Sequence, residues 1–140
     1  MNQYVDFRKL KVGEALPTRV NPPLTKLQLV RYAGAAGDFN PIHTDDAAAK
    51  TSGLGGVIAQ GPLIMGFAGK AVCQWVPKRR LKKFKVRFMG MSFPGDIITV
   101  SARVAENLDT RDGLKIRCDI TARDQNEEVK LTGLFEVLQA

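Results

Sequence analysis

The hydrophobic pattern of the chain changes its period at Lys82, and this change constrains the fold more than any other feature. Before it, apolar residues recur at the spacing of one helix face; after it, they alternate with polar residues, as in half-buried strands. Four alternating sets follow one another and predict four β-strands. Their expected inward residues are Phe84, Val86 and Phe88; Ile98, Val100, Ala102 and Val104; Leu114, Ile116, Cys118, Ile120 and Ala122; and Val129, Leu131, Phe135 and Val137.

Short polar turns separate these predicted strands. The segments Pro94-Gly95-Asp96, Asp112-Gly113 and Asp124-Gln125-Asn126 contain the residues that tight turns favour. Consecutive strands joined by short turns indicate an antiparallel sheet in the form of a meander. Such a sheet has one apolar face, which another element must cover.

A helix over residues 62–75 is the natural cover for that face. Gly61 is expected to be its N-cap, and Pro62 its first residue, a position that favours proline. Leu63 and Met65 add apolar side chains outside the main face, so we expect most of the helix surface to be buried. One helix against an antiparallel sheet is an α+β arrangement. The main apolar face consists of Ile64, Phe67, Ala68, Ala71, Val72 and Trp75.

A shorter helix is expected earlier in the chain. Thr25 and Gln28 have the spacing of a capping box, so this helix should begin at Thr25. Gly37 is a suitable stop, because glycine readily adopts the left-handed conformation that ends many helices. Residues 5–12 predict a short strand or a turn.

The loop after this helix contains the only histidine of the chain. Residues 38–43 cannot form a regular helix, because Pro41 disfavours helical geometry in the residue before it. Thr44 is then expected to cap a short helix over residues 45–51. Asp38 and His43 thus lie five residues apart in a loop stiffened by proline.

This pair is the strongest candidate for chemistry. Imidazole is the side chain best suited to moving protons near neutral pH, and a nearby carboxylate can share the task. A loop held between two helices can direct Asp38 and His43 toward one point. Spacing alone leaves a second interpretation open, in which Asp38 caps a helix and His43 is an ordinary surface or core residue.

The start of the helix at 62–75 is a second candidate. A helix N-terminus has unpaired N–H groups and a partial positive charge, which can stabilise an oxyanion on a carbonyl group. Pro62 has no N–H, so the donor would come from Gly61 or nearby. A Gly-Pro pair is also ordinary helix-start chemistry.

The basic segment at residues 78–87 is a third candidate. It could bind phosphates or an acidic carrier protein through Arg79, Arg80 and Lys83, or it could be a solvated face. Phe84 and Phe88 among basic residues could suggest binding of single-stranded nucleic acid, but their alternation predicts that they point into the core. We therefore expect no nucleic-acid partner.

Composition sets broader limits. A chain of 140 residues suits one domain, here residues 1–140, and the net charge of +7 favours acidic partners. Cys73 and Cys118 stand alone in apolar patterns, so we expect buried free thiols and no metal site. No apolar stretch resembles a membrane span or a signal peptide, and a cytoplasmic protein without a membrane partner is the default expectation.

Three motifs together resemble the MaoC-like, (R)-specific enoyl-thioester hydratase family. They are Gly37-Asp38-x-Asn40-Pro41-x-His43, then the segment 58–66 that begins Ile58-Ala59-Gln60-Gly61, and Phe93-Pro94-Gly95-Asp96. The resemblance covers nearly the whole chain in order. It implies a single hot-dog fold, in which a curved antiparallel sheet wraps a central helix.

The resemblance also implies an activity. Such enzymes are hydro-lyases that interconvert trans-2-enoyl and (R)-3-hydroxyacyl thioesters of coenzyme A or acyl carrier protein, without metal or cofactor. Asp38 and His43 would activate the water and move the proton, Asn40 would orient the loop or the water, and the Gly61 N–H would polarise the thioester carbonyl. Family members form homodimers or heterodimers with another hot-dog subunit.

Two residues depart from the family pattern. Gln60 stands where members often have histidine, and Pro62 where they often have another residue. Pro62 removes one possible oxyanion donor and leaves Gly61 as the stronger candidate. The alternative function is a non-catalytic acyl-binding subunit of a heterodimeric dehydratase, but such a subunit would not need both Asp38 and His43.

Overall fold

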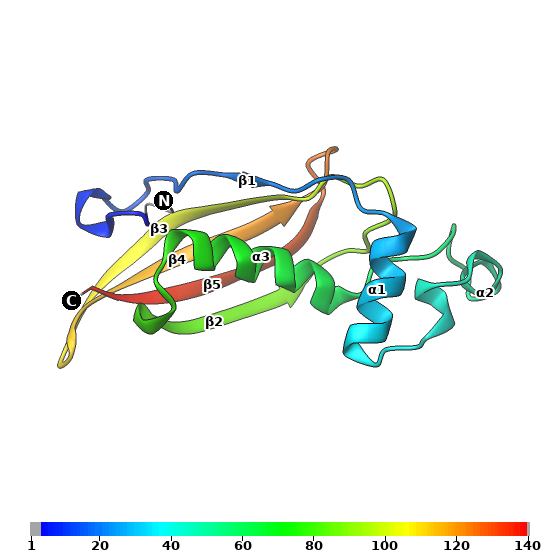
Figure 1. Cartoon of the computed structure of the whole chain (residues 1–140). Helices are drawn as coiled ribbons and strands as arrows, with labels where there is room; N and C mark the ends of the chain where they lie inside the picture. Colours follow the sequence, from blue (N-terminus) through cyan, green and yellow to red (C-terminus); the bar gives the residue numbers. More distant parts are fainter. Residues whose placement is uncertain (1–3, 140) are drawn as a thin grey trace.

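The computed structural model describes residues 4–139, which form a curved antiparallel sheet along one long helix (Figure 1). Five strands lie in the order β1-β3-β4-β5-β2. The strands are β1 (Arg19–Val20), β2 (Leu81–Phe88), β3 (Thr99–Thr110), β4 (Gly113–Arg123) and β5 (Val129–Gln139). The α+β class and the meander of the last three strands are therefore confirmed.

The position of β2 differs from the expected meander. β2 pairs with β5 at the far edge of the sheet, with Lys85 opposite Leu134, rather than with the next strand in the chain. The turn at Pro94-Gly95-Asp96 is present, but it lies inside the longer connection between β2 and β3. This connection also forms hydrogen bonds with other segments of the chain. Ser92 O accepts from Ala59 N at 2.8 Å. The chain therefore leaves the edge of the sheet formed by β2 and reaches the position between β1 and β4, where β3 begins.

β2 also differs from its expected burial. Phe84 is half-buried and Phe88 is 50% exposed, so the prediction that both point into the core is wrong for Phe88. β2 lies at the edge of the sheet. The ring of Phe88, at the end of this strand, is therefore not fully covered by helix side chains. The two-residue strand β1 was missed, because two residues show no periodicity.

The central helix α3 (Gly61–Trp75) packs one face on the sheet. The indole N–H of Trp75 donates to Pro17 O at 2.9 Å, and its ring stacks on Phe135 with centroids 6.0 Å apart. Leu63, Met65 and Phe67 are only partly buried, because the sheet covers one side of the helix. Only Pro62, Gly66 and Lys70 of this helix are exposed, so most of its surface is at least partly covered, as expected. The buried face consists of Ile64, Ala68, Ala71, Val72 and Trp75.

Helix starts follow the predicted chemistry with shifts of one residue. The helix α1 (Lys26–Ala36) is capped by the Thr25 hydroxyl, which accepts from Gln28 N at 3.1 Å. It ends at Gly37, whose φ of 68° is left-handed, as expected. α3 has Gln60 as its N-cap, not Gly61.

The short segments before α3 are also corrected in detail. The helix α2 (Asp46–Thr51) is capped by Asp45, whose carboxylate accepts from Ala47 N at 2.9 Å. Thr44, the predicted cap, instead closes the 3-10 turn η2 (Pro41–His43). Residues 5–12 contain the 3-10 turn η1 (Phe7–Lys9) rather than a strand. Among residues 4–139, no helix is long and apolar enough to cross a membrane.

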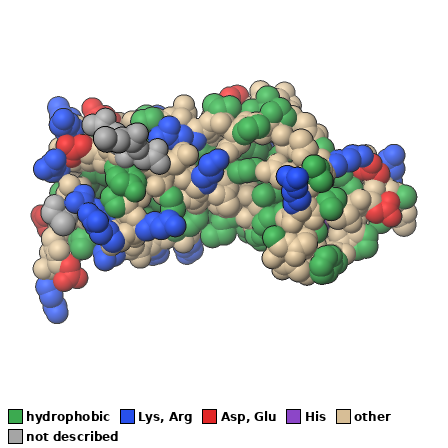
Figure 2. Space-filling view, viewed as in Figure 1, with side chains coloured by type: hydrophobic (Ala, Val, Ile, Leu, Met, Phe, Trp, Pro, Cys, Tyr) green, Lys and Arg blue, Asp and Glu red, His purple; other side chains and the backbone are tan. Residues whose placement is uncertain are grey.

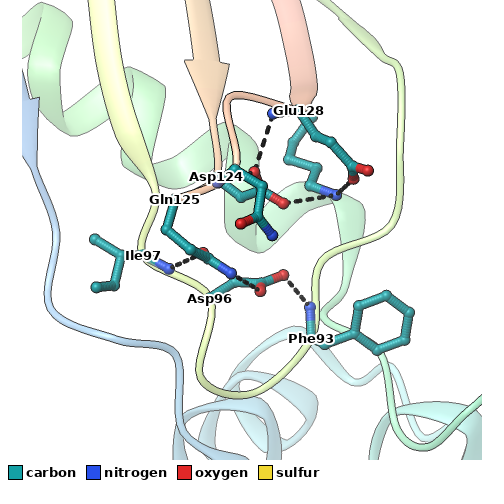
Figure 3. A network of polar contacts seen from close by, with 8 residues as sticks. Phe93, Asp96, Ile97, Asp124, Gln125 and Glu128 are labelled. Atoms are coloured by element: carbon teal, nitrogen blue, oxygen red, sulfur yellow. Dashed lines mark hydrogen bonds and ion pairs between the residues drawn. The ribbon is translucent and has the colours of Figure 1, made fainter.

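A polar network fixes the crossing connection to the turn between β4 and β5 (Figure 3). The Asp96 carboxylate accepts from Phe93 N at 2.8 Å and from the Gln125 side-chain amide at 3.0 Å. The side-chain oxygen of Gln125 in turn accepts from Ile97 N at 3.0 Å. The predicted turn at Asp124-Gln125-Asn126 thus also holds the connection between β2 and β3.

Gly133 makes the pairing of β2 with β5 possible. A Cβ atom there would lie 2.2 Å from Lys85 O, so the strand backbone would have to move. We expect Gly133→Ala to lower the free energy of unfolding by about 2 kcal/mol or more, the scale of overpacking. Gly66→Ala is the matched control, because its Cβ would meet nothing within 4 Å and alanine favours a helix interior. Urea unfolding measures both, and equal stability of Gly133→Ala and wild type would contradict the prediction.

Asp124 should make stability depend on acid. Burial opposes ionisation of its carboxyl, but hydrogen bonds from Glu128 N and Asn126 N and the Lys130 ammonium outweigh burial, so its pKa is lowered. A lowered folded-state pKa stabilises the fold above the unfolded-state pKa of about 3.9, and this stabilisation is lost as pH falls through the lower value. Asp124→Asn should be less stable at neutral pH and should lose less stability on acidification. Parallel urea titrations at several pH values test this, and coincident pH slopes would refute it.

Candidate active site

The loop that holds the predicted pair begins where α1 ends. After the left-handed Gly37, Asp38 N donates to Ala33 O at 3.1 Å, which directs the chain away from the helix. The Asn40 side chain then accepts from Ile42 N at 3.2 Å and caps η2. Asn40 N donates to the Asp38 carboxylate at 3.3 Å. Asn40 thus shapes the loop, in agreement with one of its two expected roles.

This loop brings Asp38 and His43 together. The His43 Nε2 atom lies 3.5 Å from Asp38 Oδ2, and the two side chains are 10% and 41% exposed. His43 is thus held in the interior, while the carboxylate is partly exposed. His43 is a buried residue and Asp38 accepts from a backbone N–H, as the structural interpretation also expects, but the contact between the two side chains places both at one point.

A backbone carbonyl fixes the histidine ring. His43 Nδ1 lies 2.7 Å from Ile58 O. A carbonyl oxygen only accepts hydrogen bonds, so Nδ1 carries a proton, and Nε2 is an acceptor whenever the ring holds this one proton. Nε2 and the Asp38 carboxylate are then two acceptors side by side. They can receive both O–H groups of one water molecule, and either can take its proton.

The same segment leads directly into α3. Ile58 N donates to Ile42 O at 3.1 Å, so the strand-like residues before the helix pair with the loop. Leu63 N and Ile64 N donate to Gln60 O, and Pro62 has no N–H. No acceptor for the Gly61 N–H lies among residues 4–139 in the structure. This donor stands three residues after the carbonyl that holds His43.

Gln60 joins α1 to the start of α3. Its side chain is fully buried, and its Nε2 donates to Leu29 O at 3.0 Å. Its Oε1 has no hydrogen-bond partner within the described part of the chain. Because α1 leads to Asp38 and α3 begins at Gly61, this bond sets the spacing between the two halves of the site.

The basic candidates lie at the other end of the helix. Arg79 and Arg80 follow the last turn of α3, and Lys83 is the third residue of β2. The 15 residues of α3 separate this end from Gly61 by about 22 Å at 1.5 Å per residue. The structure therefore brings Asp38, Asn40, His43 and Gly61 to one end and does not bring the basic residues to them.

Two site contacts were missed by sequence reasoning. Ile58 contributes only its carbonyl group, which leaves no signal in the identity of the residue. Phe88 lies with its ring against Gly61, where an added Cβ would be 3.4 Å away. Its place in an alternating pattern indicated the core instead.

The cysteines take no part in this site. Cys118 is buried, and burial raises its pKa to about 12, so it stays a thiol. Cys73 is only partly buried, which corrects the expectation that both are buried. The described residues hold no group of three or more His, Cys, Asp or Glu side chains that could bind a metal ion.

Comparison with known proteins follows the same motifs. Residues 7–126 match the family model described as a MaoC like domain. Enoyl-CoA hydratase 2, peroxisomal, from Arabidopsis thaliana is 26% identical over 91% of this chain and 40% of its own length. Peroxisomal multifunctional enzyme type 2 from Mus musculus is 32% identical over 64% of this chain and 13% of its own. The chain thus spans less than half the length of these curated relatives.

Solved structures confirm the hot-dog fold. The unliganded R-hydratase PhaJ1 from Pseudomonas aeruginosa superposes with a TM-score of 0.82 at 23% identity, covering 96% of this chain and 85% of that one. A MaoC-like dehydratase superposes with a TM-score of 0.86 at 27% identity, covering 98% of this chain and 43% of that one. Because the family model spans nearly the whole sequence, this chain belongs to the MaoC-like family.

Proposed function

We propose that this chain is a hydro-lyase that interconverts trans-2-enoyl and (R)-3-hydroxyacyl thioesters in fatty-acid metabolism. One observation carries the proposal most directly: His43 Nε2 and the Asp38 carboxylate lie 3.5 Å apart, and the loop that holds them bonds to Ile58, three residues before the helix start at Gly61. Relatives named enoyl-CoA hydratase 2 and R-hydratase support the same reaction class.

In the hydration direction, a water molecule donates its hydrogens to Asp38 and His43. One of these groups takes a proton as the water oxygen bonds to C3 of the enoyl thioester. The C2–C3 double-bond electrons move toward the thioester carbonyl, whose oxygen gains negative charge. The Gly61 N–H and the positive end of α3 stabilise that oxyanion. C2 then receives a proton from the pair, and one water has been added.

Substitution of the pair tests this mechanism. Asp38→Asn keeps the size of the side chain but removes its basicity, and His43→Gln removes the titrating ring. Each should lower kcat on an enoyl thioester roughly a hundredfold or more, the usual scale for a general acid–base group. The double variant should lose about as much as the worse single variant, because groups that act as a unit are not additive.

Asp45→Asn is the matched control for these variants. Asp45 lies two residues beyond His43 and caps α2, a role that asparagine can keep. It should retain wild-type turnover. Thermal melts on the same samples separate chemistry from folding. Near-normal turnover in folded Asp38→Asn or His43→Gln would refute the mechanism, and loss of activity with a collapsed melting temperature would assign that residue a structural role.

We further propose that two hot-dog units join through β2. This strand pairs only with β5 and has a free edge among the described residues. An open edge is a template for another strand. Leu63, Met65 and Phe67 pack against the core but stay partly exposed, so a second unit could bury them further. The ChsH1-ChsH2 complex from Mycobacterium tuberculosis is a related structure, at 21% identity.

Light scattering at micromolar concentration should therefore show a dimer. In a homodimer joined at β2, Lys85 and Arg87 of the two copies would lie on the same sheet face across the joint and repel. Added salt screens such repulsion and should strengthen association. A fully active monomer at this concentration would refute the proposed assembly.

A further inference from the structure

The segment 78–87 has positive charge that the fold does not neutralise. Seven of its ten residues are basic, and we call these seven the basic strip. None of the seven has a carboxylate within ion-pair distance among residues 4–139. Other basic side chains, such as Arg117 and Lys130, do have acidic partners. The basic strip consists of Lys78, Arg79, Arg80, Lys82, Lys83, Lys85 and Arg87.

The side chains of the basic strip are available to a partner. All are exposed except Arg80, which is partly buried. Figure 2 shows Lys and Arg side chains gathered over the half of the molecule where α3 ends and β2 begins. Lys85 and Arg87 border a hollow of about 480 Å³ with Leu134 on the sheet. Arg79 and Arg80 border a second hollow of about 420 Å³ beside the N-terminal segment.

The basic strip also leads to the candidate active site. β2 starts at the far end of α3 and runs back to Phe88, whose ring lies against Gly61. Its eight residues cover about 26 Å at 3.3 Å per residue. Lys85 and Arg87 lie on the sheet face away from α3. A partner bound along the strip would therefore sit within about 26 Å, along the strand, of the helix start where the thioester is expected.

The shape of the basic strip favours a protein partner. Recognition of one phosphate group needs several donors that converge on one point, whereas these side chains are spread from the 3-10 turn η3 (Lys78–Arg80) along β2 and border two separate hollows. Binding of single-stranded nucleic acid needs aromatic rings among the basic side chains. Phe84 and Phe88 instead alternate with Lys85 and Arg87, and Phe88 faces Gly61. A row of positive charge fits an extended acidic protein surface.

We propose that the basic strip docks an acidic carrier protein that presents the acyl thioester to Asp38 and His43. This inference rests on the proposed function and adds the identity of the carrier to it. Backbone pairing at the β2 edge would leave these side chains on the sheet face, so docking and dimer formation are compatible.

Kinetics on three forms of the substrate test the proposal. The same enoyl group is carried by an acidic acyl carrier protein, by coenzyme A, or by a short pantetheine analogue without phosphate. The variant is Arg80→Glu combined with Lys83→Glu and Lys85→Glu. The control, Lys50→Glu combined with Arg111→Glu, reverses charges that are exposed and outside the strip.

For the carrier-protein substrate, we expect the strip variant to raise KM about tenfold or more with little change in kcat, as loss of steering charges does. Salt should raise the wild-type KM in the same way. The short analogue should be turned over equally by wild type, variant and control. Thermal melts verify folding of each protein.

Other outcomes would overturn the proposal. An unchanged KM for the carrier-protein substrate would show that the strip is only a solvated face. An equal rise in KM for the coenzyme A thioester would assign the strip to phosphate binding. Tighter binding of single-stranded RNA than of the carrier protein, measured by fluorescence anisotropy, would also overturn it. If wild type turns over no thioester, the proposed function fails, and anisotropy with the loaded carrier protein still decides whether the strip docks it.

Discussion

The packing of α3 against the concave face of the sheet is the constraint that organises the rest of the molecule. Trp75 and Val72 are fully buried there, and burial of one such side chain contributes about 1.5–3 kcal/mol. A single helix packs along the concave face of the sheet. Its direction therefore determines which segments of the chain lie at each end of the molecule. The loop with Asp38 and His43 meets its start, and the basic residues follow its last turn.

The elements with strong local patterns could be predicted from the sequence. The Thr25 cap, the Gly37 stop and the alternation of β3, β4 and β5 are local, and each is present in the structure. The place of β2 could not be predicted, because its pairing of Lys85 with Leu134 joins residues far apart in the chain. Short polar turns signal that the chain bends, but they do not say which strand it meets next.

The candidate site also has some features that the sequence predicts and others that it does not. The types and spacing of Asp38 and His43 are visible in the sequence, and so is the helix start at Gly61. The orientation of the histidine is not, because it depends on the carbonyl of Ile58, and any residue supplies a carbonyl. The fold therefore determines which ring nitrogen carries the proton. Ile58 O holds the proton on Nδ1, and Nε2 is left as the acceptor that can bind a water.

The charges of β2 connect solubility with recognition. An open edge strand tends to pair with other chains without control, and lysine on such a strand is a common protection. Here the protective charges alternate with the apolar Phe84 and Val86, so one face of the strand completes the core and the other faces water. The fold relieves this positive charge only in part, because its sheet neighbour Glu136 is already paired with Arg117 and Lys115, and Asp119 borders the same hollow as Lys85 and Arg87 without forming an ion pair with them. Its remaining attraction is directed outward, along the strand that ends beside Gly61.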